Sequence, residues 1–220
     1  MATWVIHFRV ADMILDALPV PDRDAFILGS VAPDSGSPSA DGLRYLPDKS
    51  VSHFYTQDTA GQHSISLTFF DRTCLCQPFS SDRQKAFLLG YYAHLITDVY
   101  WVQTFLAPEK QRLADLYQRD KAGFYRLIKR DWYDADFIYL AHHPELPAFL
   151  AYRSMPDITN HFMPIFAPDA FARRREAMCA FYDENVPRVT ERKTSPSAEA
   201  LNRFVDETGH ACIQMLSAYL

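Results

Sequence analysis

The sequence predicts an all-α protein, and two features of the chain support this prediction. Apolar residues recur at intervals of three and four in several segments, which is the spacing of one buried helix face. The chain of 220 residues has only seven glycines, whereas leucine, alanine, phenylalanine and tyrosine are abundant. This length can bury a large core in one domain, so we expect residues 1–220 to form a single multi-helix bundle.

The N-terminal part of the chain predicts two helices followed by a loop. Residues 4–18 place apolar side chains at helical spacing, and prolines end the pattern. Residues 22–31 are a shorter apolar segment, with Asp34 just beyond it. Serine, glycine, proline and aspartate dominate residues 35–50, which predicts a loop that either lines the mouth of a site or only connects two elements.

A long helix that carries residues 94–98 is expected to run to about Leu106. Ser80, Ser81 and Asp82 are candidates for its N-cap, because their side chains cap helices well. Residues 87–101 are apolar nearly all round, as in a helix that lies inside a core. Further helices are expected over residues 109–143, with a break around Gly123, and over residues 144–152, 169–184 and 197–220.

His94 and Asp98 lie four residues apart inside this apolar helix. On a helix, such a spacing puts both side chains on one face. A buried carboxylate and a buried imidazole are unfavourable unless a partner compensates them, and a divalent cation is one such partner. A hydrogen-bonded histidine–aspartate pair in a core is the alternative explanation for these two residues taken alone.

Three earlier segments carry residues of the same types. His7 lies in the first amphipathic segment, Asp34 ends a Gly-Ser-Val-Ala-Pro-Asp sequence, and His53 stands in Ser-His-Phe after a polar linker. Histidine and aspartate are common ligands of zinc and related metals. With His94 and Asp98, these residues form a set of five candidate metal ligands.

In this order along the chain, the motifs resemble the zinc-dependent phospholipase C family, whose relatives include single-strand-specific zinc nucleases. They are also similar to the N-terminal domain of glycosylphosphatidylinositol-specific phospholipase D. The resemblance covers about the first half of the chain, to near Trp101. It implies an all-helical fold of the phospholipase C and zinc nuclease type, with a metal cluster in a cleft between helices.

The resemblance also implies roles for single residues. Asp34, His53, His94 and Asp98 match the family's first zinc site, and Asp98 matches the carboxylate that bridges to a second zinc bound by His7. Asp34 is in addition a candidate catalytic general base, because spacing does not separate that role from ligation. The histidines of the family's third site have no counterpart directly after Asp98, so we expect one or two ions, of zinc or another divalent transition metal.

Such a cluster would act on phosphate esters. Its three neutral imidazoles and two carboxylates carry a charge of −2, so two zinc ions would leave the site positive. Zinc lowers the pKa of a bound water toward about 7 and supplies hydroxide at neutral pH. We therefore expect a metal-dependent phosphoesterase, a phospholipase C-like hydrolase that uses metal-bound hydroxide on a phosphate-ester small molecule or lipid headgroup. The alternative is a non-catalytic metal-binding helical protein with a degenerate cluster.

Composition restricts partners and location. The formal net charge of −5 gives no basic surplus, which argues against nucleic acid as a partner. No segment has the apolar length of a transmembrane span, and the N-terminal residues lack the pattern of a signal peptide. The four cysteines lack zinc-knuckle spacing, which favours reduced thiols. These features predict a cytoplasmic protein; its oligomeric state is left open, because apolar helix faces serve cores and dimers alike.

Polar residues outside the five-residue set give weaker signals. His63 is a candidate for substrate contact, whereas His142 and His143 end a helix and are expected on the surface. The acidic and aromatic segment 130–136 lacks the glycine and terminal glutamate of an EF-hand loop, so its aspartates are expected to be solvated or capping. The arginines at 173–175 are expected on a solvated face.

Overall fold

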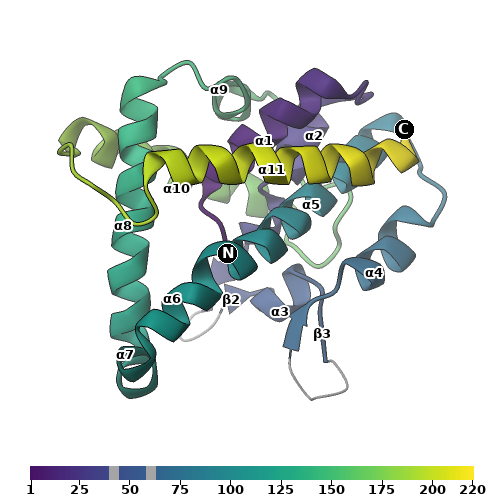
Figure 1. The fold of residues 1–220 in the computed structure, drawn as a ribbon. Coiled ribbons are helices and arrows are strands. Elements are labelled where there is room, and N and C mark those ends of the chain that lie inside the picture. The colour runs from purple at the N-terminus through teal and green to yellow at the C-terminus, as the bar shows by residue number, and fades with distance from the viewer. Residues whose placement is uncertain (40–44, 58–62) are drawn as a thin grey trace.

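Helices make up nearly all of the regular structure in this computed structural model, which describes residues 1–39, 45–57 and 63–220. Strands occur there only as two short antiparallel ribbons of two strands each. The predicted all-α fold class is therefore confirmed (Figure 1). The organisation of residues 1–220 as a single domain stays a prediction.

Three helices carry most of the residues that matter for the site. They are α1 (Trp4–Ala17), α2 (Arg23–Gly29) and α5 (Asp82–Trp101). The Ser81 hydroxyl accepts a hydrogen bond of 3.1 Å from the backbone N–H of Gln84, so Ser81 is the cap of α5 among the three candidates at residues 80–82. α5 passes through the middle of the bundle, so its central turns are buried on every side (Figure 1).

α2 and α5 cross with their backbones in direct contact. A Cβ atom on Gly29 would overlap the carbonyl oxygen of Phe87, and a Cβ atom on Gly90 would overlap the carbonyl oxygen of Phe26. Only glycine at both positions allows this approach. The crossing brings the chain just after α2 against the turn of α5 that follows Gly90, where His94 lies.

The segment between α2 and α5 is irregular. A 3₁₀ turn (Ala32–Asp34) follows α2, and a short helix, α3 (Lys49–Ser52), precedes His53. The predicted loop 35–50 contains a ribbon of β1 (Ser37–Pro38) and β2 (Tyr45–Leu46), while its residues 40–44 lie outside the described part. The remaining elements here are β3 (Tyr55–Gln57), β4 (His63–Ile65), α4 (Leu67–Phe70) and a π-helical turn (Asp71–Leu75).

Six helices follow α5, and the helical path continues through a π-helical segment to Leu106, as expected. The predicted break near Gly123 lies at Asp120 instead, where the carboxylate accepts a 2.7 Å hydrogen bond from the Gly123 N–H. The helices are α6 (Ala107–Arg112), α7 (Ala114–Arg119), α8 (Lys121–His142), α9 (Pro147–Ser154), α10 (Ala170–Asn185) and α11 (Ala198–Leu216).

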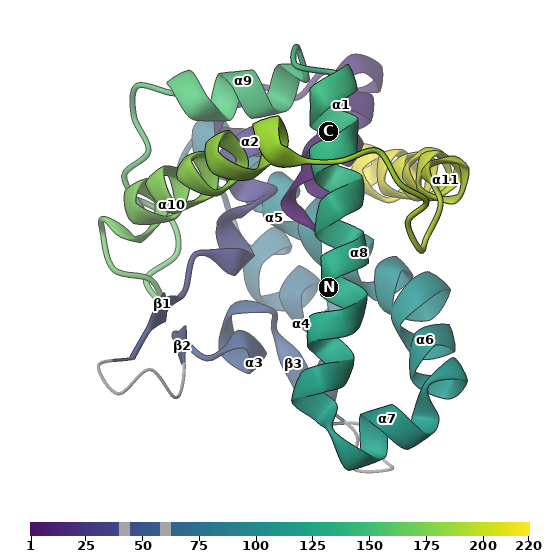
Figure 2. The ribbon, with the colours of Figure 1, turned by 90° about the vertical axis from the view of Figure 1, so that its left-hand side faces the viewer.

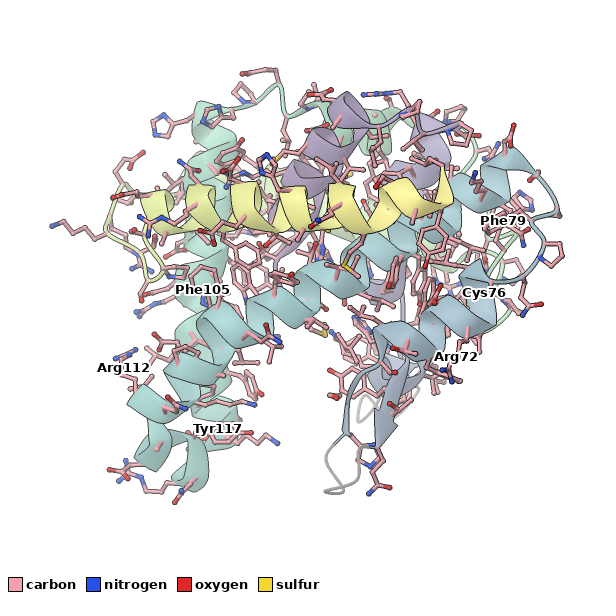
Figure 3. The ribbon with its side chains drawn as sticks, turned by 45° about the vertical axis from the view of Figure 1, so that its right-hand side comes forward. Arg72, Cys76, Phe79, Phe105, Arg112 and Tyr117 are labelled. Carbon is pink, nitrogen blue, oxygen red and sulfur yellow. The ribbon has the colours of Figure 1, made fainter. Side chains whose placement is uncertain are left out.

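The arrangement of these helices leaves two arms below the bundle. α8 runs along one side, with α9 and α10 near its upper end and α6 and α7 leading into its lower end (Figure 2). Figure 3 shows the arm that carries Arg112 and Tyr117 on one side, and the segment that carries Arg72 and Cys76 on the other.

No described helix is both long enough and apolar enough to cross a membrane.

Asp136 corrects one expectation about segment 130–136. This residue is 2% exposed, and its carboxylate accepts hydrogen bonds from the Thr3 hydroxyl at 2.6 Å and the Tyr182 hydroxyl at 2.8 Å. The expected solvated or capping role is wrong for Asp136, because the helical repeat places it on the same buried face as Trp132 and Leu140.

Candidate metal centre

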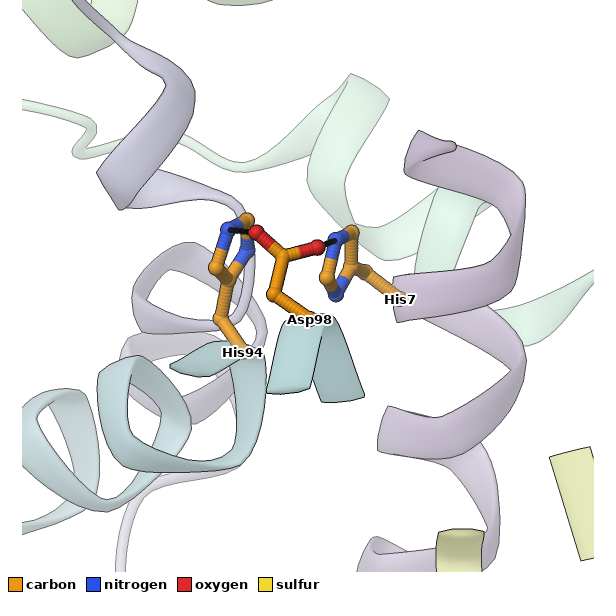
Figure 4. A group of neighbouring side chains, drawn as sticks. All are labelled: His7, His94 and Asp98. Atoms are coloured by element: carbon orange, nitrogen blue, oxygen red, sulfur yellow. Dashed lines mark ion pairs between the residues drawn. The ribbon is translucent and has the colours of Figure 1, made fainter. Parts of the chain in front are cut away.

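The five candidate ligands converge in the interior of the bundle. His7 comes from α1, Asp34 from the turn after α2, and His53 from the end of α3, while His94 and Asp98 come from α5. Figure 4 shows His7 and His94 on opposite sides of the Asp98 carboxylate. The Asp34 side chain is 10% exposed, and the other four ligand candidates are fully or almost fully buried.

Four of these side chains, Asp34, His53, His94 and Asp98, bring donor atoms close together. The His53 Nε2 atom lies 3.6 Å from Asp34 Oδ1 and 3.6 Å from Asp98 Oδ2. The His94 Nε2 atom lies 3.5 Å from Asp98 Oδ2 and 3.4 Å from His53 Nε2. Tetrahedral zinc with nitrogen and oxygen ligands at about 2.0–2.2 Å requires ligand atoms to be separated by roughly 3.3–3.6 Å. The donor set and its spacing therefore fit zinc.

His7 approaches the same carboxylate from the other side. Its Nε2 atom lies 3.6 Å from Asp98 Oδ1, and its ring stacks on that of His94 with 3.8 Å between centroids. Asp98 Oδ1 also accepts a 2.7 Å hydrogen bond from the Ala2 N–H. His94 belongs to this side of the cluster as well, so His7, His94 and Asp98 form a second group of three donors that overlaps the first.

Several atoms of this cluster are buried polar atoms with no hydrogen-bond partner in the described part of the chain. They include both ring nitrogens of His7 and Oδ2 of Asp98. Unsatisfied polar atoms are unfavourable in a protein interior, and native structures have few of them. Cations on the two sides of Asp98, one coordinated by Oδ2 and the other by a ring nitrogen of His7, would supply the missing partners.

Hydrogen bonds outside the cluster fix the orientation of two imidazoles. The Nδ1–H of His94 donates to the Ser30 carbonyl at 2.9 Å, which leaves its Nε2 lone pair facing the cluster. The Nδ1 atom of His53 lies 2.9 Å from the Ser52 hydroxyl, and the Ser52 carbonyl accepts a hydrogen bond from Tyr91. Partners of this kind orient metal ligands and set their tautomer.

The protonation states also suit metal binding. Burial lowers the pKa of His7 and of His53 to about 4, so both rings are neutral at pH 7. Burial opposes ionisation of Asp34, but the ammonium of Lys49, 3.2 Å away, and the nearby imidazoles hold its pKa below the ordinary value. Burial also opposes ionisation of Asp98, but nearby positive charge and the neighbouring imidazoles outweigh burial and lower its pKa. Metal ligation needs neutral imidazoles and ionised carboxylates.

A cavity of about 460 Å³ opens beside the cluster. Asp34, Lys49 and Ser52 line one part of it, and α8 and α10 supply the facing walls. Its volume falls in the range of sites for small molecules. The arrangement therefore combines a candidate metal centre with space for a ligand next to it.

Residues 6–101 match the family model described as zinc dependent phospholipase C. This segment belongs to the zinc-dependent phospholipase C family. The matched segment begins just before His7 and ends with α5, so it contains all five candidate ligands. The family description gives zinc as the cofactor and indicates, at the family level, a metal-dependent phosphoesterase that acts on a lipid or another phosphoester. Neither the curated proteins nor the solved structures contain a match to this chain.

The other histidines lie apart from this cluster. His142 is exposed and pairs with Glu191 at 2.6 Å, and His143 is exposed and stacks on Tyr139. His63 begins β4 as an exposed residue and is not among the residues that line the cavity.

Sequence reasoning missed part of the cavity wall. Lys49, Lys129 and Arg174 all line it, whereas the arginines at 173–175 were expected on a solvated face. That expectation is wrong for Arg174, which is half-buried. One signal was present in α8, where Tyr125, Lys129 and the aromatic residues 132–133 share one helix face.

Proposed function

We propose that this chain is a zinc-dependent phosphoesterase of the phospholipase C type. In this proposal Asp34, His53, His94 and Asp98 hold one zinc ion, and His7 with Asp98 contributes to a second, weaker site. The observation that supports it most is the 3.4–3.6 Å spacing of four donor pairs, which join His53 to Asp34, His94 and Asp98, and His94 to Asp98; this spacing suits tetrahedral zinc.

Each residue of the site has a definable task. When bound, zinc polarises a phosphoryl oxygen and lowers the pKa of a coordinated water. Ser30 and Ser52 hold the two imidazoles in the orientation that ligation requires. The Lys49 ammonium lies at the cavity surface beside Asp34, where it attracts an anionic phosphate ester toward the cluster.

For Asp34 we propose the role of ligand rather than general base. Its Oδ1 atom faces both His53 Nε2 at 3.6 Å and Lys49 Nζ at 3.2 Å. An oxygen between an ammonium and an imidazole keeps its negative charge, which suits coordination of a cation and reduces the tendency to take up a proton.

The test compares His94→Ala with His142→Ala. The second variant removes an exposed imidazole outside the cluster and is the matched control. We expect the wild-type chain and His142→Ala to bind zinc in at least equimolar amount and to hydrolyse bis(p-nitrophenyl) phosphate or p-nitrophenyl phosphate. His94→Ala should lose both properties, as shown by elemental analysis and nitrophenolate release.

Two results would contradict the proposal. Full zinc occupancy in His94→Ala would remove His94 from the site. Equimolar zinc in the wild-type chain without turnover of either ester would instead support the alternative, a non-catalytic metal-binding protein.

A cytoplasmic location stays a prediction as well. It is checked by fractionation of cells that express the chain, with the protein expected in the fraction that contains neither membranes nor culture medium.

The prediction that residues 1–220 form a single domain is checked by limited proteolysis, which should give no stable fragment that ends near residue 101.

A further inference from the structure

The cavity beside the cluster has an unusual charge distribution. Three cationic side chains line it, from three different elements: Lys49 of α3, Lys129 of α8 and Arg174 of α10. Asp34 is the acidic residue among the described lining residues, and it already faces Lys49 and His53. With a cation at the cluster, the space next to it would be strongly positive.

Two of these cations have no carboxylate partner in the part of the chain that the structure describes. Arg174 donates from Nη2 to the Gly36 carbonyl at 2.6 Å, and its Nε atom is buried without a hydrogen-bond partner. No ion pair between described residues includes Lys129, and burial and the charge of Lys49 lower its pKa. Neighbouring cations differ: Arg130 pairs with Asp131 at 3.4 Å, and Arg173 pairs with Asp169.

This pattern favours one kind of ligand. A buried guanidinium N–H without a partner and an unpaired ammonium both gain from an anionic group, and arginine suits phosphate and carboxylate oxygens. A quaternary ammonium would instead face like charges, although aromatic rings such as Tyr125 and Tyr133 also line the cavity. The cations therefore select against a cationic headgroup.

We propose that Lys129 and Arg174 bind a second anionic group of the substrate, so that the preferred substrate is a phosphate ester with a further phosphate or carboxylate beyond the phosphate at the cluster. This inference rests on the proposed function for the position of the first phosphate. The shared chemistry fits either a lipid with an anionic headgroup or a water-soluble organic phosphate.

Binding to the zinc-loaded full chain tests the proposal without turnover. Three phosphomonoesters differ in the charge of the second group: phosphocholine is positive, glycerol 3-phosphate neutral and 3-phosphoglycerate negative there. Isothermal titration calorimetry should give the tightest binding for 3-phosphoglycerate and the weakest for phosphocholine, with about tenfold or more between them. Lys129→Gln should reduce this ratio at least about threefold, and Arg174→Gln should do the same.

Arg130→Gln is the matched control, since it removes one positive charge from the next position of α8, outside the cavity lining. It should keep the wild-type ratio. Arg174 also contacts Gly36 and Trp4, so its variant is interpreted only if its unfolding midpoint is close to that of the wild type. Lys129→Gln then remains as the decisive variant.

Hydrolysis separates the two sources of substrate. Mixed micelles of phosphatidylcholine, phosphatidylglycerol or phosphatidylinositol 4-phosphate test the lipid source, and glycerophosphocholine against glycerophosphoinositol 4-phosphate tests the soluble source. Faster cleavage of the more anionic member supports the proposal and identifies the source. Binding of phosphocholine as tight as that of 3-phosphoglycerate, or an unchanged ratio in Lys129→Gln, would overturn it. The expected binding order without any hydrolysis would leave this inference standing and count against the proposed function.

Discussion

Asp98 and Asp136 are both buried carboxylates that contact the first residues of the chain, yet their surroundings differ. Asp98 accepts a hydrogen bond from the Ala2 N–H and otherwise faces imidazoles, with its Oδ2 atom lacking a hydrogen-bond donor. Asp136 has a hydroxyl donor on each oxygen, from Thr3 and Tyr182. The protein therefore supplies a hydrogen-bond donor to both oxygens of Asp136 but to only one oxygen of Asp98.

The difference also reverses the direction of the pKa shifts. Burial dominates at Asp136 and raises its pKa to about 7, because two neutral hydroxyls compensate the charge only in part. At Asp98, nearby positive charge and the neighbouring imidazoles outweigh burial and lower the pKa. Burial of an acidic group therefore does not by itself indicate a metal site. The groups around the carboxylate, hydroxyls at Asp136 and imidazoles at Asp98, distinguish a structural carboxylate from a candidate metal ligand.

The largest expected effect separates the two carboxylates directly. Asp98→Asn should weaken zinc binding by at least about a hundredfold, because it removes the charge and one oxygen donor from the centre of the cluster. Asp136→Asn should bind zinc as the wild type does. Competition with a chelator measures both affinities. If Asp136→Asn lost zinc to the same degree, the contrast between the two groups would be wrong.

The next effect concerns the crossing of α2 and α5, which positions residues of the cluster but not Asp136. Gly90→Ala should destabilise the fold by about 3 kcal/mol, because its Cβ overlaps the Phe26 carbonyl and forces α2 away from α5. The shift should also weaken zinc binding, since Asp34 and Ser30 follow α2 directly. Ala93→Gly, on the same helix, is a control that removes a methyl group without adding volume. Unfolding in urea and chelator competition measure the two changes, and wild-type values for Gly90→Ala would contradict this account.

A smaller effect is the pH dependence of stability in the metal-free chain. The folded-state pKa of Asp136, about 7, lies above its ordinary value of 3.8, so Asp136 makes the fold less stable as the pH rises from about 4 to 7. His7 and His53, with pKa values of about 4 against 6.5, act in the opposite direction, and their contribution is lost as the pH falls from about 6.5 to 4.

Asp136→Asn therefore sharpens the comparison. Relative to the wild type, its unfolding free energy should rise steadily between about pH 4 and 7, by a few kcal/mol at most. Urea titrations at four or five pH values measure the slopes. Parallel curves for the two proteins would show that Asp136 does not titrate as proposed.

The smallest effect concerns the orientation of His53. Tyr91→Phe removes the hydroxyl that donates to the Ser52 carbonyl, next to the residue whose hydroxyl contacts His53. A loss of about tenfold or less in zinc affinity is expected, as for other groups that position ligands. Tyr92→Phe is the control on the neighbouring residue. Equal affinities in all three proteins would mean that this contact does not position His53.

Much of the fold and of the cluster was accessible from the sequence. The helical spacing of apolar residues predicted the main helices, and His94 and Asp98 had to share a face once their segment was helical. The order of motifs led to the zinc-dependent phospholipase C family, which the match over residues 6–101 confirms. In contrast, the burial of Asp136 and the cavity position of Arg174 were missed, because each depends on which neighbouring element covers one helix face.

The sequence by itself determined the residue types and the local geometry: helices, their caps and the pair on one turn of α5, because these depend on contacts within a few residues. Only the tertiary structure decided that His7, Asp34 and His53 reach that pair, and that Lys129 and Arg174 face a cavity beside it. These arrangements depend on contacts between distant segments, such as the backbone crossing at Gly29 and Gly90, and such contacts leave no periodic pattern in a single chain.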